Sequence, residues 1–207
     1  LAYKEKKLKR RLACSSFSQV SYVLFGIFLL SMEGLYGSLL QMVFHALAKN
    51  ALFLCAGAVI CKTGCTRVKE LRGMGKRMPA VMVCFALSSL SLVGIPPAGG
   101  FLAKWHLAVG AMRTEAGLFT WLGPVVLMVS ALLTAGYLFP VIVEGFFPEK
   151  DWKKTEKSEA GRSCAGASAV SVFIKVPLAV LGISLLVLGA LGKPVFELLR
   201  GIASAMV

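Results

Sequence analysis

Two lysines, Lys49 and Lys104, lie inside long apolar stretches of the sequence. A lysine near the centre of a lipid bilayer costs roughly 2.5–3.5 kcal/mol even on the mildest insertion scale. A serine or an asparagine could join two membrane helices by a hydrogen bond at a lower cost. An amine in such surroundings is suited to gaining and losing a proton, because burial penalises the charged form of an ionisable group. The two lysines are therefore the first candidates for chemistry.

Polar residues precede Lys49 at helical spacing. His45 lies four residues before it and Gln41 four residues before that, so the three share one face of a helix. Histidine titrates near neutral pH and can pass a proton to a neighbouring amine. Asn50 follows Lys49 directly and could alter the hydration beside it. A purely structural hydrogen bond between helices is the alternative interpretation of this polar face.

Lys104 follows an interruption of its apolar stretch. Pro96 and Pro97 remove two backbone donors, and two glycines follow them. Non-helical backbone at membrane depth persists only where protein or water satisfies it, so we expect the break to face a cavity. His106 comes two residues after Lys104 and could line the same path. A lysine that extends to the membrane surface beside a tryptophan is the alternative interpretation.

The first apolar stretch also carries polar side chains, at Ser16, Ser18 and Gln19 among others. Small hydroxyl residues allow helices in lipid to approach and to hydrogen-bond one another. A hydrated path lined by the same residues is the second interpretation.

Five stretches are long and apolar enough to carry these residues across a membrane. The chain is 57% hydrophobic with a mean hydropathy of +0.77, whereas soluble domains are about 45–50% apolar. A membrane-spanning helix needs about 20 mostly apolar residues. The stretches cover about 12–32, 34–61, 78–112, 119–147 and 171–192. We therefore expect an all-α, polytopic membrane helix bundle with about five transmembrane spans, one of them broken at the two prolines.

The distribution of basic residues explains the net charge of +13. Seventeen of the 23 lysines and arginines lie before the first stretch, between the second and third, or between the fourth and fifth, and Lys175 lies at the start of the fifth. Basic residues gather on the cytoplasmic side of membrane proteins. This predicts a cytoplasmic N-terminus and a C-terminus outside, and it gives no reason to expect a nucleic-acid partner.

Motifs for an active site are missing from the sequence. It contains no phosphate-binding loop, no hydrolase or metalloprotease motif and no dinucleotide-binding motif, and its cysteines have no metal-binding spacing. We expect no cofactor, no metal and no active site of the chain's own.

Four ordered segments resemble the antiporter-like proton-translocating membrane subunits of respiratory complex I, energy-conserving hydrogenases and Mrp-type antiporters. They are KLKRRLACSSFSQVSYVLFG, HALAKNALFL, VKELRGMGKRMP and GIPPAGGFLAKW. The resemblance implies that 1–147 forms part of the second repeat of such a subunit. A cytoplasmic loop over 148–170 and a C-terminal transmembrane helix over 171–207 would follow, in the plasma membrane of a bacterium or an archaeon.

The resemblance also implies roles for individual residues. His45 and Lys49 would belong to a central proton-conducting chain, and Lys104 would be the exit-side lysine of the second half-channel. Two positions depart from the family pattern, with Cys14 where tyrosine is usual and Asn50 where a small apolar residue is usual. The family's first repeat is absent from this sequence, so we expect the chain to hold half of a pathway.

Three functions remain open. In the first, the chain is a membrane subunit of a proton-translocating NADH:quinone oxidoreductase-like or hydrogenase-like complex, and it takes part in an enzyme only through that complex. In the second, it belongs to a multisubunit sodium/proton antiporter. In the third, it is a non-transporting scaffold in which both lysines tolerate neutral replacements. The expected partners are other membrane subunits, the lipid bilayer, and protons or sodium ions.

Overall fold

The computed structural model describes residues 2–96, 98–114, 117–147 and 172–206. Within these ranges the regular elements are helices, apart from one isolated bridge between Lys7 and Arg67. They are α1 (Leu8–Phe28), α2 (Met32–Thr63), the 3-10 helix η1 (Val68–Leu71), α3 (Met74–Arg77), α4 (Pro79–Val93), α5 (Gly99–Arg113), α6 (Leu118–Phe146), α8 (Val172–Leu191) and α9 (Lys193–Met206). The prediction of an all-α membrane helix bundle is confirmed. The predicted loop over 148–170 lies outside the described residues.

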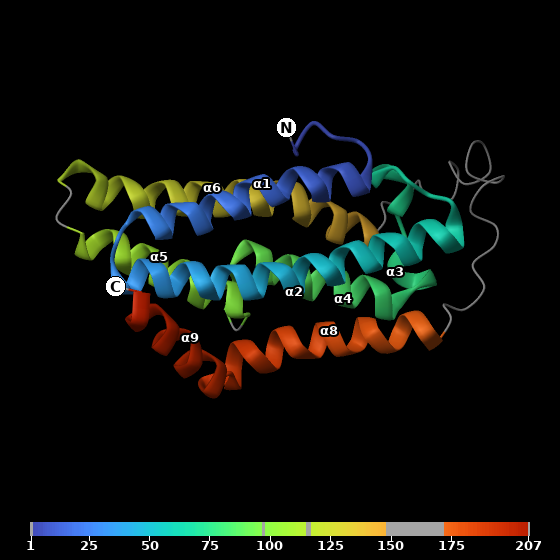
Figure 1. Ribbon diagram of the computed structural model, residues 1–207. Coiled ribbons are helices and arrows are strands. Elements are labelled where there is room, and N and C mark those ends of the chain that lie inside the picture. Colours follow the sequence, from blue (N-terminus) through green and yellow to red (C-terminus); the bar gives the residue numbers. More distant parts are fainter. Residues whose placement is uncertain (1, 97, 115–116, 148–171, 207) are drawn as a thin grey trace.

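Three helices are long and apolar enough to cross a membrane, over Met32–Thr63, Thr120–Phe146 and Ile174–Leu191. Helix α1 and the pair α4–α5 run alongside them (Figure 1). Helices α4 and α5 have 15 residues each. Each is therefore only about 22 Å long against a hydrocarbon core of about 30 Å, so the two cross such a core only as an end-to-end pair.

Helix α2 is the central helix of the bundle. It begins at an N-cap, Ser31, whose hydroxyl oxygen accepts from the Gly34 amide at 3.2 Å, and it ends at Gly64 in the left-handed conformation, with φ 71°. It packs against α1, α4, α5, α8 and α9. Small side chains such as Ala48 and Ala56 face these neighbours and are fully buried, which lets the helices approach closely. Both His45 and Lys49 therefore project from a helix that has neighbours on several sides.

The predicted break lies between α4 and α5. Helix α4 ends at Val93, and the following Gly94 has φ 89° and donates its amide to Leu90 O at 2.9 Å. Helix α5 begins five residues later, at Gly99. Pro96 is exposed within the break, and Pro97 lies outside the described residues. The two helices thus continue one another end to end rather than forming one rod.

Helix α1 begins earlier than the sequence pattern predicts. It includes Lys9, Arg10 and Arg11 in its first turns. The Arg11 guanidinium donates to Glu5 O at 2.9 Å and to Tyr137 O at 3.1 Å. These bonds satisfy the Arg11 guanidinium within the protein, whereas Lys9 and Arg10 are exposed.

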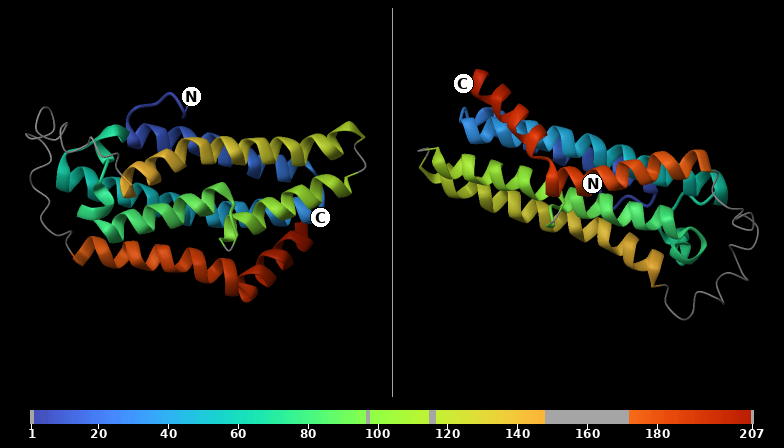
Figure 2. Two further views of the ribbon diagram at one scale, coloured as in Figure 1. Left: turned by 180° about the vertical axis from the view of Figure 1, so that it is seen from behind. Right: turned by 90° about the horizontal axis from the view of Figure 1, so that it is seen from below.

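The C-terminal region differs from the single helix predicted over 171–207. The structure divides it into α8 and α9, with a bend at Gly192, directly before Lys193 and Pro194. Proline lacks an amide hydrogen and fits the first turn of a new helix better than the interior of an old one. The bend lies level with the α4–α5 break, and α9 leans back towards α2 (Figures 1 and 2). There the rings of Phe196 and Phe44 are 6.3 Å apart.

Candidate functional site

Lys49 points from α2 into its interface with α1 and is only 7% exposed. Its ammonium group donates to the Leu12 carbonyl oxygen and to the Ser15 hydroxyl oxygen. Ser15 donates its own proton to the Leu12 carbonyl at 2.8 Å. No carboxylate pairs with Lys49 in the described part of the chain. The charge of Lys49 is thus met by neutral oxygen atoms of one neighbouring helix.

His45 lies one turn before Lys49 on α2 and is half-buried. Its Nδ1 atom is shielded from solvent and has no hydrogen-bond partner among the described residues. One further turn along α2, Gln41 Nε2 donates to Gln19 Oε1 of α1 at 2.7 Å. Both glutamines are buried, so this bond joins the two helices inside the bundle. The structure therefore aligns Gln41, His45 and Lys49 along α2, as their spacing predicts.

The amide pair leaves two polar atoms unsatisfied. Gln19 Nε2 and Gln41 Oε1 are buried and have no partner in the part of the chain described. A buried polar atom without a partner costs about 1–3 kcal/mol. Water molecules bind at such positions when several polar groups converge. The α1–α2 interface therefore has unused hydrogen-bonding capacity at the glutamine pair.

The remaining predicted residues of this region have no described hydrogen bond to Lys49. Ser18 has a buried hydroxyl without a described partner, and Ser16 is half-buried. Asn50 is exposed on the outer side of α2 and does not share the partners of Lys49. The hydroxyl that contacts the lysine is that of Ser15, one residue before Ser16. That these other residues line a path stays a prediction.

Lys104 turns back from α5 to the end of α4. Its ammonium group donates to the carbonyl oxygens of Leu92 at 2.7 Å and of Val93 at 2.6 Å. It also lies 5.4 Å from the ring centre of Tyr22 on α1. The C-terminal end of a helix carries a partial negative charge, so a lysine is favoured there. Lys104 satisfies these two carbonyl groups, and the expectation that the break faces a cavity stays a prediction.

Gly94 makes room for the Lys104 side chain. A Cβ atom added to Gly94 would lie 2.9 Å from Cδ and 3.3 Å from Nζ of Lys104. The φ angle of 89° is also one that residues other than glycine rarely adopt. The break and the lysine therefore fit together only with glycine at this position.

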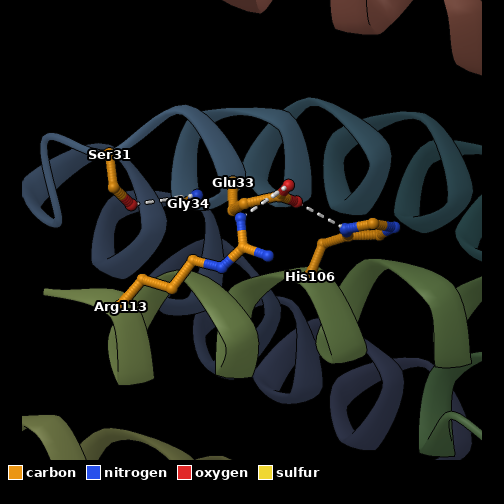
Figure 3. Close-up of polar contacts among 5 residues, drawn as sticks. All are labelled: Ser31, Glu33, Gly34, His106 and Arg113. Atoms are coloured by element: carbon orange, nitrogen blue, oxygen red, sulfur yellow. Dashed lines mark hydrogen bonds and ion pairs between the residues drawn. The ribbon is translucent and has the colours of Figure 1, made fainter.

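A second polar cluster lies at the opposite end of the bundle from the α2–α3 connection. Glu33 Oε2 is 2.8 Å from Nδ1 of His106, and Glu33 Oε1 is 3.4 Å from Nη1 of Arg113 (Figure 3). The ring of Tyr36 meets His106 edge-on, with 4.7 Å between the ring centres. Figure 3 shows Glu33 between the two basic side chains, so the cluster ties α2 to α5.

The sequence brings His106 close to Lys104, but the structure separates their side chains. Two residues along a helix correspond to about 200° of rotation. Lys104 accordingly faces α4 and α1, whereas His106 faces Glu33 on α2. Glu33 was not among the predicted site residues. The available signal is its place in the first turn of α2, where an acidic side chain suits the helix dipole.

Replacing Glu33 by glutamine is expected to lower the thermal midpoint of the detergent-solubilised protein by about 2–4 °C. The change removes the anion between His106 and Arg113, a loss of about 1 kcal/mol. The matched control is Glu197→Gln on the exposed surface of α9, which should leave the midpoint within error. An equal fall in both variants would mean that the cluster adds nothing specific to stability.

The chain matches known membrane proteins along most of its length. Residues 1–134 match the family described as NADH:quinone oxidoreductase/Mrp antiporter, TM. NADH-quinone oxidoreductase subunit N of Desulforudis audaxviator (strain MP104C) is 36% identical over 199 residues, which are 95% of this chain and 39% of that protein.

Solved structures show the same fold. A chain in the structure of the Mrp complex from Dietzia sp. DQ12-45-1b has a TM-score of 0.83 and 26% identity, over 99% of this chain and 43% of that one. A chain of respiratory complex I from Thermus thermophilus with bound NADH has a TM-score of 0.78 and 21% identity, over 99% of this chain and 40% of that one. The chain thus spans 39% to 43% of the length of these proteins. It belongs to the NADH:quinone oxidoreductase/Mrp antiporter transmembrane family.

Proposed function

We propose that the chain is part of a membrane subunit that relays protons through Lys49, His45 and Lys104. The subunit would work in a multisubunit complex of the NADH:quinone oxidoreductase or hydrogenase type. One observation carries the proposal. Both lysines lie within the bundle, and their hydrogen-bond partners among the described residues are carbonyl and hydroxyl oxygens.

The choice of partners matters because it determines whether a lysine can release its proton. A carboxylate beside an ammonium group favours the charged form strongly, as in an ordinary ion pair. Neutral oxygen atoms also bind the ammonium group, but they stabilise its charged form less than a carboxylate does. Loss of the proton therefore costs less free energy. A lysine surrounded in this way can alternate between its two forms.

Electrostatic repulsion between the lysines would couple their protonation. Leu12 and Tyr22, which contact Lys49 and Lys104 respectively, are ten residues apart on α1, or about 15 Å along the helix. If the two ammonium groups are separated by a similar distance, they repel by about 1 kcal/mol at an effective dielectric constant of about 20. Protonation of one lysine would therefore favour release of the proton from the other.

A sodium/proton antiporter is the second candidate, because a structure of an Mrp complex shares the fold. Sodium would need several oxygen ligands free of competing positive charge. The carbonyl oxygens at the end of α4 are already bound by the Lys104 ammonium group. This arrangement supports protons as the transported ion.

The test measures proton uptake by proteoliposomes that contain the assembled complex with either the natural chain or the Lys104→Ala variant. We expect assembly to persist and the number of protons moved per electron to fall. Replacing sodium by potassium should leave uptake by the natural complex unchanged. Unchanged uptake in the variant would favour the non-transporting scaffold, and uptake that requires sodium would favour the antiporter.

A further inference from the structure

Tyr22 has a place at the Lys104 site that its sequence context does not reveal. It lies on α1 within an apolar stretch, and its side chain is buried. The Lys104 ammonium group lies 5.4 Å from its ring centre while it donates to the two carbonyl groups at the end of α4. We propose that Tyr22 is a positioning residue for Lys104, with its ring as one wall of the ammonium site and its hydroxyl anchored by Ser130. The proposal rests on the proton-relay function proposed above.

The ring distinguishes the two protonation states of the lysine. The face of an aromatic ring attracts a cation within about 6 Å, and the attraction is larger where water is excluded. A neutral amine has no such attraction to the ring. Its interaction with the negative end of α4 is weaker as well. Tyr22 therefore holds Lys104 in place while it is protonated and releases it when the proton leaves.

The orientation of the ring is set by α6. Tyr22 donates its hydroxyl proton to Ser130 Oγ at 2.6 Å, as assigned from the geometry of the two hydroxyl groups. The side chains of Leu107 and Leu127 pack against the same ring. Contacts from α5 and α6 thus hold the ring while its face remains available to the lysine.

Tyr22 also connects the two lysines through one helix. The buried face of α1 includes Leu12, Ser15, Gln19 and Tyr22. Leu12 and Ser15 bind Lys49, and Tyr22 faces Lys104. A displacement of α1 at one lysine would therefore change the contacts of the other lysine.

The experiment compares three variants of the assembled complex in proteoliposomes. Tyr22→Leu removes the ring, Tyr22→Phe keeps the ring but loses the hydroxyl, and Ser130→Ala removes the anchor. We expect Tyr22→Leu to lower pumping several-fold and to move the alkaline limb of the pH profile by roughly one unit towards lower pH. Tyr22→Phe and Ser130→Ala should cause a smaller loss of pumping and a smaller shift of the limb than Tyr22→Leu, because Leu107 and Leu127 still hold the ring.

Tyr36→Leu is the matched control, since Tyr36 is also buried but faces His106 rather than Lys104. It should lower the amount of assembled complex without moving the pH profile. If Tyr22→Leu does not assemble, Tyr22→Met replaces it, because methionine fills an irregular space without supplying a ring.

Lys104→Ala, measured in the same series, separates the two proposals. Pumping that survives Lys104→Ala contradicts the proton relay itself, whatever Tyr22 does. If Lys104→Ala abolishes pumping while Tyr22→Leu keeps both the natural rate and the natural pH profile, the role of Tyr22 is overturned. Equal losses in Tyr22→Leu and Tyr22→Phe would also overturn it, because they would assign the effect to the hydroxyl.

Discussion

Proton pumping by the assembled complex is expected to fall at least about tenfold when Lys49 is replaced by alanine, which corresponds to about 1.4 kcal/mol on the barrier. The Lys49 ammonium group lies between α1 and α2. In the described structure it donates to Leu12 O and to the Ser15 hydroxyl oxygen. Alanine leaves no titratable group at this position. The oxygen atoms can take up water instead, so the complex should still assemble.

Lys49→Arg is the more informative companion to this variant. Arginine retains a positive charge and several donors, but it stays protonated at every accessible pH. A relay therefore predicts that Lys49→Arg also loses pumping, whereas a structural need for charge predicts that it restores pumping. Asn50→Ala is the control, because its side chain is the exposed neighbour on α2. The measurement is proton uptake per electron transferred, with the amount of assembled complex determined in parallel.

Replacing Gly100 by alanine is expected to lower the amount of assembled complex several-fold and to abolish pumping by the remainder. A Cβ atom at Gly100 would collide with the carbonyl oxygen of Ser91, a main-chain atom of α4 that cannot turn aside. The two halves of the broken helix would be forced apart. Lys104, one turn later on α5, would then be carried away from Leu92 O and Val93 O.

Gly136→Ala on α6 is the control for this prediction, because a Cβ atom there meets no atom within 4 Å. Alanine is also the better helix former by about 1 kcal/mol, so this change should leave assembly unaltered or improved. Western blots of membranes and proton uptake report the two quantities separately. If both glycine variants assemble and pump alike, the packing of α4 against α5 does not govern the site.

The positions of the helices could be predicted because long apolar stretches and a proline-containing break are local properties of the sequence. The face that each helix turns inward could be predicted only in part. Spacing along α2 correctly aligns Gln41, His45 and Lys49. On α1, serines occur at several neighbouring positions, so no simple period separates Ser15, which contacts Lys49, from Ser16 and Ser18.

Contacts between distant elements could not be predicted in the same way. His106 and Lys104 are close in sequence, yet the helix turns them to different neighbours. Glu33 is 73 positions from His106, and no local feature of the sequence indicates that the two side chains are in contact. In the sequence Tyr22 resembles an ordinary packing residue of an apolar helix. Its contact with Lys104 arises only because α5 packs near α1. Such features depend on how the helices pack, and no single stretch encodes that.

Three of the four hydrogen-bond acceptors that bind the two lysines are main-chain oxygens, those of Leu12, Leu92 and Val93. A main-chain carbonyl is present whatever side chain the residue carries. In a comparison of natural variants, the three positions could therefore exchange one apolar residue for another and still bind the lysines. Selection would instead act on Gly94 and Gly100. These glycines bind no proton, but they allow the backbone conformation and the close packing at the break. Among natural variants, we therefore expect the glycines next to this site to vary less than the residues whose carbonyl groups bind the lysines.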